Sequence, residues 1–334
     1  MKYLKYVFAL LAVIIVITLM QNPSKVTKSD FLLDTYVSVT AYGKGADKAA
    51  DEVLKRTREI ENLLSAYIPE SDVSRINSAQ QGLHTVVSPE CFSLIERALY
   101  LSEKTNGAFD ITIKPALDLW GFGKEESVPG DEELLDAIKK VDYKNVMLNY
   151  GNSSVILFEE GMKIDLGGIA KGYCADEAIR ILKENNIENA YIDFGGNVVT
   201  LGEKPLGLFE RIRYGKKTRP FVIGVQDPTK ARGETIETIE AKDSPCSIVT
   251  SGGYERYFEE DGKMYHHILD PKTGMQPEND ILSVTVKSVS STDGDALSTA
   301  IFVLGDSCDF KSLSGLAEEI IIVRNTGEIE KIYP

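Results

Sequence analysis

The order in which strands and helices follow one another constrains this fold more than any other feature of the sequence. Apolar periodicity predicts helices at residues 46–66, 89–105, 131–141, 167–186 and 293–304. Extended segments are expected at residues 30–42, 155–158, 162–165, 191–194, 221–225, 247–250, 282–287 and 320–323. Strands and helices do not alternate as regular βαβ units. The sequence therefore favours an α+β fold, with a mixed sheet and flanking helices, over a doubly wound parallel sheet.

An uncharged segment near the N-terminus, Tyr6–Met20, follows Lys2 and Lys5. Counted from Tyr3, the segment has 18 residues, which as a helix would span about 27 Å. The hydrocarbon core of a bilayer is roughly 30 Å thick, so this length suits a membrane anchor. A cleavable signal peptide begins in the same way, but no A-x-A cleavage site is present and no cysteine follows the run for lipid attachment.

The chain is expected to consist of an N-terminal segment and one large domain. Residues 1–22 are predicted to form an uncleaved transmembrane anchor, with a signal segment as the alternative. Residues 23–29 have the composition of a polar linker, and the domain is expected to cover residues 30–334. Because lysines precede the apolar run, the positive-inside rule places this domain outside the cytoplasm.

Charge and cysteine content exclude several classes of function. The chain has 51 acidic and 37 basic residues, and its formal net charge is −14. Such a surface repels nucleic acid, so DNA and RNA are excluded as partners. A small anionic substrate would need a cation or backbone dipoles to receive it locally. The four cysteines are scattered without a C-x-x-C pair, which argues against a zinc site or a disulfide framework.

A glycine turn between a strand and a helix is the first candidate site. In KIDLGGIAKGYCADEAI, residues 163–179, an acid ends an extended segment, two glycines form the turn, and Lys171 lies in the first turns of the helix. Glycines allow a ligand to approach the backbone, and the free N–H groups at a helix start favour phosphate. The alternative is an ordinary turn with Lys171 in solvent.

A possible metal site lies in STDGDALSTAIFVLG, residues 291–305. Asp295 and Thr299 are four residues apart, so a helix places both oxygens on one face. One carboxylate, one hydroxyl and a nearby carbonyl suit Mg²⁺, which takes few protein ligands. Alternatively, Asp295 only favours the helix dipole and Thr299 packs inside.

Two of the three histidines stand together in YHHILDPKTGMQP, residues 265–277. Neighbours on an extended segment point to opposite faces, so one of His266 and His267 is expected to face a site. The following D-P-K-T-G is typical of a rigid turn, and a histidine held beside it could serve as a general base. Surface decoration of a hairpin is the alternative.

Three further stretches carry suggestive side chains. Residues 63–77 present Ser65 and Tyr67 at a helix end, and residues 107–123 gather aromatic rings around Asp110. Aromatic residues at such spacings line a ligand site in some proteins, but more often they belong to the hydrophobic core. The basic stretch at residues 211–219 is unusual in an acidic chain. It is expected to be a solvated hairpin turn, with a membrane or partner contact as the alternative.

Taken together and in this order, the blocks resemble the ApbE family of flavin transferases. The matching sets extend from about Leu33 to Val303 and read S-A-Y…D-V-S-R-I-N, G-A-F-D…W-G-F-G, D-L-G-G-I-A-K-G-Y, H-I-L-D-P-K-T-G and D-A-L-S-T-A. The resemblance implies a T-fold-like catalytic domain that binds FAD and Mg²⁺. It also implies transfer of FMN, through a phosphoester bond, to a Thr or Ser hydroxyl of a target protein with release of AMP.

By position, the resemblance assigns roles to particular residues of this chain. The Mg²⁺ ligands would be Asp295, Thr299 and the carbonyl of Gly168. The FAD contacts would be Leu33, Tyr67, Ala108, Phe109, Asp110, Asp165, Lys171 and Leu269. His267 would activate the acceptor hydroxyl, a task that suits a histidine with its ordinary pKa of about 6.5.

Two departures from the family pattern matter. The family often has Met-Gly-Thr where this chain has Leu33-Asp34-Thr35, although Leu33 still offers an apolar contact. The acceptor motif S-[GA]-A-T-[ST] is absent, so the target is expected to be another polypeptide.

The resemblance also implies typical targets, which are flavoprotein subunits of membrane electron-transport complexes. Together with the predicted anchor, this places the enzyme at the extracytoplasmic face of a bacterial inner membrane. FAD hydrolysis to FMN and AMP, and non-enzymatic FAD binding, are the alternatives.

Overall fold

The computed structural model describes Tyr6 and residues 24–334. Its centre is an eight-stranded sheet with the order β1-β2-β6-β7-β12-β15-β16-β17. The strands are β1 (Lys25–Leu32), β2 (Thr35–Tyr42), β6 (Asn189–Phe194), β7 (Asn197–Leu201), β12 (Cys246–Gly252), β15 (Ile281–Ser288), β16 (Glu319–Arg324) and β17 (Ile329–Ile332). All neighbouring pairs in this sheet are antiparallel. The expectation of a mixed sheet is therefore wrong, because hairpins and antiparallel returns join the strands.

The single strand expected at residues 30–42 is a hairpin. Leu33 and Asp34 have φ of 55° and 56° and form a two-residue turn between β1 and β2. Two positive φ values suit the twist of a hairpin, but neither residue is the glycine or asparagine that usually marks this turn. Because β1 begins at Lys25, residues 25–29 are strand and not the expected linker.

The predicted anchor, residues 1–22, lies outside the described residues except for Tyr6, so it stays a prediction. Within the part of the chain that the structure describes, no helix is both long and apolar enough to cross a membrane.

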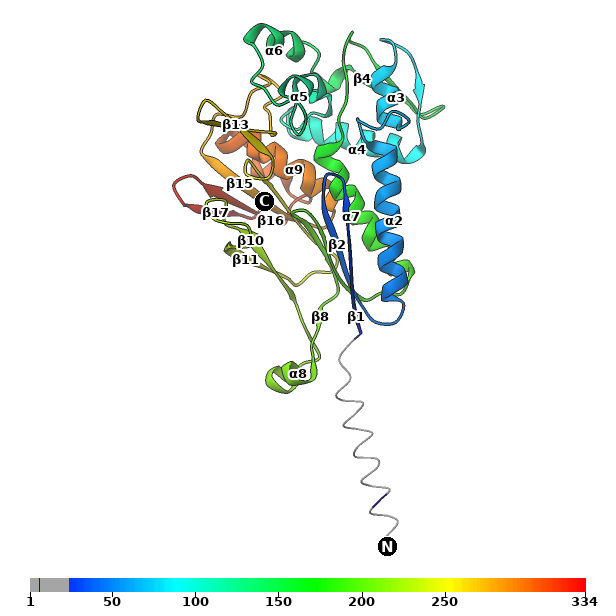
Figure 1. Ribbon diagram of the computed structural model, residues 1–334, viewed down its shortest axis with the longest axis vertical. Helices are drawn as coiled ribbons and strands as arrows, with labels where there is room; N and C mark the ends of the chain where they lie inside the picture. The colour runs from blue at the N-terminus through cyan, green and yellow to red at the C-terminus, as the bar shows by residue number, and fades with distance from the viewer. Residues whose placement is uncertain (1–5, 7–23) are drawn as a thin grey trace.

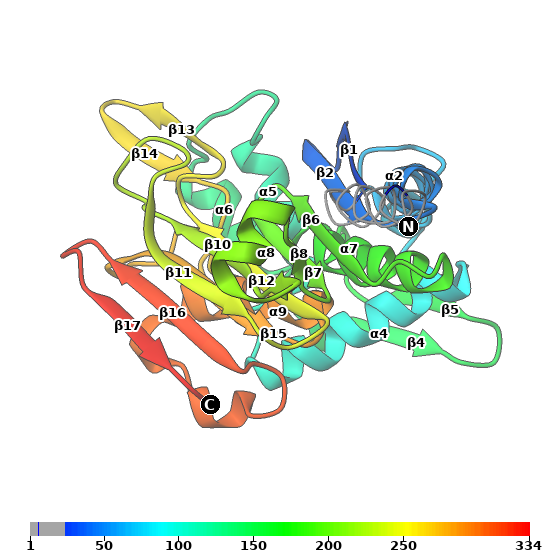
Figure 2. The same cartoon turned by 90° about the horizontal axis from the view of Figure 1, so that it is seen from below.

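Three helices cover one face of the sheet (Figures 1 and 2), α2 (Ala46–Leu64), α7 (Gly167–Glu184) and α9 (Ser291–Leu304), and a fourth, α4 (Pro89–Lys104), packs against α9. All four were expected from the sequence. Ser88 caps the N-terminus of α4, because its hydroxyl accepts a hydrogen bond from the Cys91 N–H at 3.1 Å. The other face carries the hairpin of β10 (Phe221–Gln226) and β11 (Thr235–Ala241).

Both faces of the sheet are thus buried at β16, and the sequence of this strand shows the consequence. Ile320 and Ile322 pack into the core on the helical side, whereas Ile321 packs into the core beneath β10 and β11. A strand covered on both faces has a continuous apolar run in place of alternation. The strand expected at residues 320–323 is therefore confirmed.

A third apolar group, which we call the aromatic cluster, contains Trp120, Phe258 and Leu269 together with Ala116 and Leu134. It joins α5 (Lys114–Trp120) and α6 (Asp131–Ile138) to the hairpin of β13 (Tyr257–Glu260) and β14 (Lys263–His266) at the upper end of Figure 1. Trp120 is fully buried, and its Nε1–H donates to the Gly274 carbonyl at 2.8 Å. The core interpretation of this ring is confirmed.

The remaining elements surround these layers. They are α3 (Asp72–Ser78), the small sheet of β3 (Thr85–Val86), β4 (Val146–Asn149) and β5 (Ser154–Leu157), and the pair β8 (Lys204–Pro205) and β9 (Thr218–Arg219). The basic stretch does not form the plain hairpin turn that was expected. The connection between β8 and β9 contains the helix α8 (Leu208–Tyr214).

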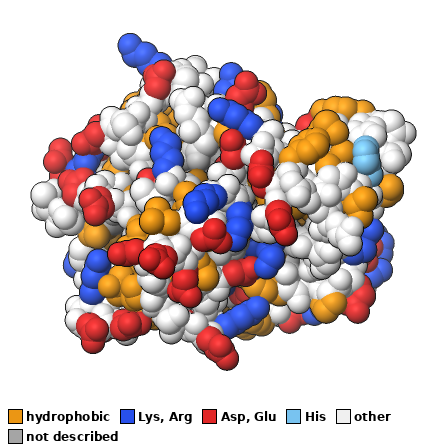
Figure 3. Space-filling model, turned by 90° about the horizontal axis from the view of Figure 1, so that it is seen from above, with side chains coloured by type: hydrophobic (Ala, Val, Ile, Leu, Met, Phe, Trp, Pro, Cys, Tyr) orange, Lys and Arg blue, Asp and Glu red, His pale blue; other side chains and the backbone are white. Residues whose placement is uncertain are grey.

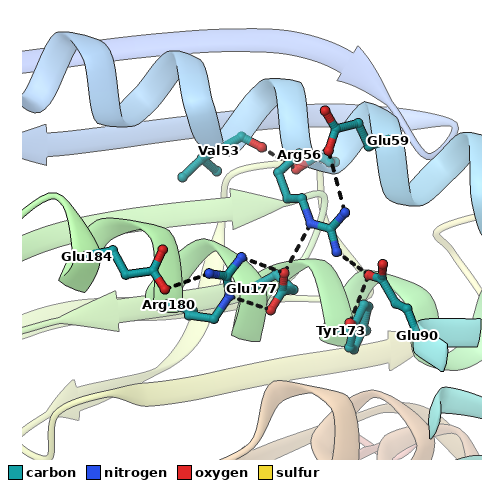
Figure 4. Close-up of polar contacts among 9 residues, drawn as sticks. Val53, Arg56, Glu59, Glu90, Tyr173, Glu177, Arg180 and Glu184 are labelled. Carbon is teal, nitrogen blue, oxygen red and sulfur yellow. Dashed lines mark hydrogen bonds and ion pairs between the residues drawn. The ribbon is translucent and has the colours of Figure 1, made fainter.

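A half-buried ion network ties three helices together (Figure 4). The Arg56 guanidinium on α2 donates to Glu90 on α4 and to Glu177 on α7, the latter at 3.1 Å. Tyr173 and Arg180 complete the network through Glu90 and Glu177. The two carboxylates raise the pKa of Arg56, so it stays charged.

Replacing Arg56 by methionine is expected to lower the free energy of unfolding by about 2 kcal/mol, because two half-buried carboxylates lose their shared cation. Urea unfolding of the variant measures this loss. The neighbouring Lys55 is exposed and reaches only Glu59, at 3.6 Å, so Lys55→Met is the matched control and should cost about 0.5 kcal/mol or less. Equal losses in the two variants would contradict the assignment of stability to the network.

Candidate active site

A cleft of about 380 Å³ opens between the β1–β2 turn, the ends of the helices and the aromatic cluster. Every residue that the sequence assigned to a site lines this one cleft. These residues are Leu33, Tyr67, Ala108, Phe109, Asp110, Asp165, Gly168, Lys171, His267, Leu269, Asp295 and Thr299. Five blocks far apart in the sequence are therefore brought together by the fold.

The glycine turn is tightly held where it enters the cleft. The Asp165 N–H donates to the Ile111 carbonyl, and the Asp165 Oδ1 accepts from the Gly167 N–H, both at 2.7 Å. Helix α7 begins at Gly167, as expected. Phe109 covers Gly168 so closely that a Cβ there would lie 3.2 Å from the ring. An apolar wall and an exposed turn of backbone thus stand side by side.

Helices α7 and α9 approach each other at Gly172, where a Cβ would lie 2.2 Å from the Ser291 carbonyl oxygen. This close approach brings Asp295 to the start of α7. The Asp295 Oδ2 accepts from the Gly172 N–H at 2.9 Å, and its Oδ1 lies 3.7 Å from the Lys171 Nζ. Asp295 is buried, so its charge is balanced by this ammonium and this N–H group.

Thr299 lies one turn after Asp295 on the same face of α9. Its hydroxyl donates to the Asp295 carbonyl at 3.3 Å and lies 3.3 Å from the Ser251 hydroxyl. The expected pairing of a carboxylate and a hydroxyl on one helix face is therefore confirmed. Among the described residues, no group of three or more His, Cys, Asp or Glu side chains is placed to hold a metal.

The two adjacent histidines point in different directions, as expected. His267 lines the cleft, whereas His266 packs edge-on against the Phe302 ring at 5.4 Å. The His267 Nδ1 lies 3.1 Å from the Arg256 carbonyl oxygen. Since a carbonyl only accepts, Nδ1 carries the proton and Nε2 keeps its lone pair.

The pKa of His267 departs from the ordinary value that was expected. Desolvation first, and then the nearby positive charge of Arg256, lower its pKa to about 3. The expectation of an unshifted pKa near 6.5 is wrong, because the side chain is partly withdrawn from water beside a cation. His267 is therefore neutral at pH 7, with the Nε2 lone pair free, and its lowered pKa makes it a weaker base than an ordinary histidine.

Asp110 lines the cleft, but its carboxylate is already occupied. Its Oδ1 accepts from the Thr112 N–H at 2.8 Å and from the Thr112 hydroxyl at 2.6 Å, and its Oδ2 accepts from the Tyr143 N–H at 2.9 Å. Burial raises the pKa of this carboxyl, and these donors oppose the rise. The side chain therefore holds the loop that lines this part of the cleft in shape.

Tyr67 stands half-exposed at the cleft between two lysines. The Nζ atoms of Lys114 and Lys124 lie 4.5 and 3.8 Å from the centre of its ring. Lys114 is buried and paired with Asp118. The ring is therefore a platform beside positive charge, an arrangement suited to a planar or anionic ligand.

Sequence reasoning missed several residues of the cleft. Thr250, Ser251 and Gly252 at the end of β12, and Glu255 and Arg256 after it, line the cleft. The sequence that could have indicated them is the Thr-Ser-Gly-Gly at residues 250–253, where a strand leads into a glycine turn like the one at residues 165–168.

The β1–β2 turn adds two further residues to the cleft, Asp34 and Thr35. Arg256 lies 3.5 Å from Asp34, and the Leu33 N–H donates to Glu61 at 2.9 Å. These contacts fix the turn that carries Leu33 against the rest of the cleft.

Comparison with known proteins relates this chain to one family. The sequence model of the ApbE family matches residues 33–319. The FAD:protein FMN transferase of Treponema pallidum is 35% identical over 290 residues, which cover 84% of this chain and 78% of that protein. The enzyme of the same name from Klebsiella pneumoniae is 40% identical over 258 residues, covering 77% of this chain and 75% of that protein.

Solved structures agree with the sequence matches. The ApbE protein of Thermotoga maritima superposes with a TM-score of 0.81 at 36% identity, covering 92% of this chain and 97% of that one. The flavin transferase ApbE from Vibrio cholerae superposes with a TM-score of 0.78 at 25% identity, covering 93% of this chain and 97% of that one. The α+β fold expected from the sequence is shared with both.

Proposed function

This chain belongs to the ApbE family, and on that premise we propose that it transfers the FMN part of FAD to a Thr or Ser hydroxyl of a target protein and releases AMP. One observation carries the proposal: the eleven site residues of the five sequence blocks and Leu33 line a single cleft. A shared fold alone does not require an apolar wall, a buried carboxylate and a neutral histidine to lie in one cleft, whereas a shared activity does.

The walls of the cleft suit the parts of FAD. Leu33, Ala108, Phe109 and Leu269 supply apolar surface for flat rings, and Tyr67 adds an aromatic face. Lys171, in the first turns of α7, is the cation placed to meet the diphosphate, and Gly168 lines the cleft next to it.

The donor set fits Mg²⁺. Asp295 Oδ1 accepts no hydrogen bond among the described residues and lies 3.7 Å from the Lys171 ammonium, and Thr299 supplies a hydroxyl from the same helix face. With the Gly168 carbonyl, these oxygens are the hard ligands that Mg²⁺ prefers. A bound Mg²⁺ supplies positive charge that stabilises the charge developing on the diphosphate oxygens.

His267 receives the proton in the proposed reaction. Its Nε2 accepts the proton of the acceptor hydroxyl, while the Nδ1–H bond to the Arg256 carbonyl fixes the ring. The hydroxyl oxygen forms a bond to the phosphorus on the FMN side. The bond from that phosphorus to the bridging oxygen breaks, and AMP leaves with this oxygen.

The acceptor is proposed to be a flavoprotein subunit of a membrane electron-transport complex that carries an S-[GA]-A-T-[ST] motif. This motif is absent from the present sequence, which supports action on another polypeptide. The apolar run at residues 6–20 supports an anchored enzyme at the extracytoplasmic face of a bacterial inner membrane.

The test is to incubate the protein with FAD, Mg²⁺ and a purified acceptor domain, and to weigh the acceptor by mass spectrometry. The expected result is an acceptor heavier by one FMN less one water, with one AMP released per transfer. Release of FMN and AMP without a gain in acceptor mass would instead establish FAD hydrolysis. Bound FAD without any AMP would establish a binding protein and overturn the proposal.

A further inference from the structure

The connection between β8 and β9 projects from the body of the protein. We call residues 207–219 the basic tip. Its helix α8 stands apart from the main sheet at the lower end of Figure 1, and Figure 2 shows it in front when the molecule is seen from below. Gly215 ends the helix in a left-handed conformation, with φ of 64°. The segment is thus an ordered projection and not a plain turn.

The basic tip exposes large apolar side chains. Phe209 is 83% exposed and Ile212 is 73% exposed, and their spacing of three residues places them on one face of α8. Tyr214 follows at 47%. No other large apolar side chain among the described residues is as exposed as Phe209. Exposed apolar side chains gathered on a projection indicate a surface that contacts a membrane or another protein.

Positive charge surrounds these side chains. The tip has five Lys or Arg residues and one acid, Glu210, so its net charge is +4 in a chain whose total is −14. Arg219 lies 4.0 Å from Glu210. Arg213, Lys216 and Lys217 are exposed, and in the described part of the chain no carboxylate lies within ion-pair distance of them. Figure 3 views the opposite end, where acidic and basic side chains are interspersed.

The tip lies at the end of the molecule where β1 begins. Figure 1 shows the start of β1 and helix α8 at the same lower end. Strand β1 begins at Lys25, and the sequence before it contains the apolar run 6–20. Strand β1 rises from there for eight residues, about 25 Å, to the turn at Leu33 that lines the cleft. A flat surface that met both the tip and Lys25 would leave the cleft free.

We propose that the basic tip binds the surface of a lipid bilayer that contains anionic lipids. Phe209 and Ile212 enter the boundary between headgroups and acyl chains, and Arg213, Lys216 and Lys217 contact lipid phosphates. An apolar face flanked by basic side chains is the pattern of an interfacial helix. The proposal concerns a site outside the cleft and stands whether or not the proposed transfer reaction is correct.

The test places a fluorescent reporter on the tip. Trp120 is the only tryptophan and is fully buried, so an indole introduced by Phe209→Trp can be followed in the full chain. The protein is reconstituted in vesicles of phosphatidylcholine and phosphatidylglycerol that contain doxyl-labelled lipid. The matched control is Leu135→Trp, at a position 66% exposed on α6 at the opposite end of the molecule.

Quenching of the Phe209→Trp indole is expected to exceed that of the Leu135→Trp indole by at least about threefold. It should weaken when Arg213, Lys216 and Lys217 are all changed to Glu, or when phosphatidylglycerol is left out. Equal quenching at the two positions would overturn the proposal and leave a protein partner as the occupant. Quenching that stays the same after the three substitutions to Glu, and also after phosphatidylglycerol is left out, would overturn the role of anionic lipid. Transfer to a soluble acceptor, measured in each variant, shows separately that the cleft is intact.

Discussion

Changing Asp295 to asparagine is expected to lower kcat/KM for flavin transfer at fixed Mg²⁺ by on the order of 100-fold or more, equivalent to about 2.7 kcal/mol of transition-state stabilisation. Asparagine keeps the volume, and its carbonyl can still accept from the Gly172 N–H. The variant therefore removes the negative charge that would hold the cation and leaves the packing in place. Transfer rates measured over a range of Mg²⁺ concentrations, together with calorimetric titration of Mg²⁺ alone, check both parts of this expectation.

Asp293 provides the matched control on the same helix. Its carboxylate is bound by Arg97, at 2.7 and 2.6 Å, and it does not line the cleft. Asp293→Asn should reduce stability through loss of this pair and leave the Mg²⁺ titration unchanged. If both variants titrated like the unaltered protein, or if Asp295→Asn retained full activity, Asp295 would not be a metal ligand.

The secondary structure could be predicted wherever one physical signal dominated. Helix α4 has a serine cap and a proline at its start, and β16 has an apolar run buried on both faces. The β1–β2 hairpin could not be predicted in the same way, because its turn uses Leu33 and Asp34 at positive φ. The pairing of β1 with β2 in the sheet offsets the conformational cost of these two positive φ values, and this pairing is visible only in the folded chain.

The residues of the site were easier to predict than their states. The family resemblance identified twelve of the residues that line this cleft. The occupied carboxylate of Asp110 depends on Tyr143, and the lowered pKa of His267 depends on Arg256. These partners are distant in the sequence or follow no periodic pattern, so only the folded chain could reveal them.

Net charge misled in a similar way. A chain of −14 was expected to repel an anionic substrate unless a local cation received it. Lys171, Lys124 and Arg256 line the cleft and can do so, while five further positive charges are gathered on the basic tip. Seven acidic residues also line the cleft, so these cations act locally within an acidic lining. The basic tip, in contrast, carries a net charge of +4.

Changing His267 to alanine is expected to lower kcat for transfer by roughly 100- to 10,000-fold, the usual contribution of a general base, with little change in KM for FAD. The side chain has no hydrogen bond except that of Nδ1 to the Arg256 carbonyl among the described residues, so its loss should not unfold the cleft. Steady-state kinetics with a purified acceptor measures the effect, and added imidazole should restore part of the rate. His84 lies outside the cleft beside Ser154, and His84→Ala should retain the normal rate.

The pH dependence separates a base from a merely structural residue. Because the folded protein holds the pKa of His267 near 3, its neutral form persists as pH falls through 6.5 and is lost only near the lowered value. Since kcat/KM reports the free enzyme, its profile should show no acidic limb near pH 6.5. The lowered pKa also makes the unfolded chain bind the proton first, so this histidine's contribution to stability is present above pH 6.5 and declines as pH falls from 6.5 towards 3. A limb at pH 6.5 that disappears in His267→Ala would show that the histidine is a base with an ordinary pKa. A fully active His267→Ala variant would show that it is no base at all.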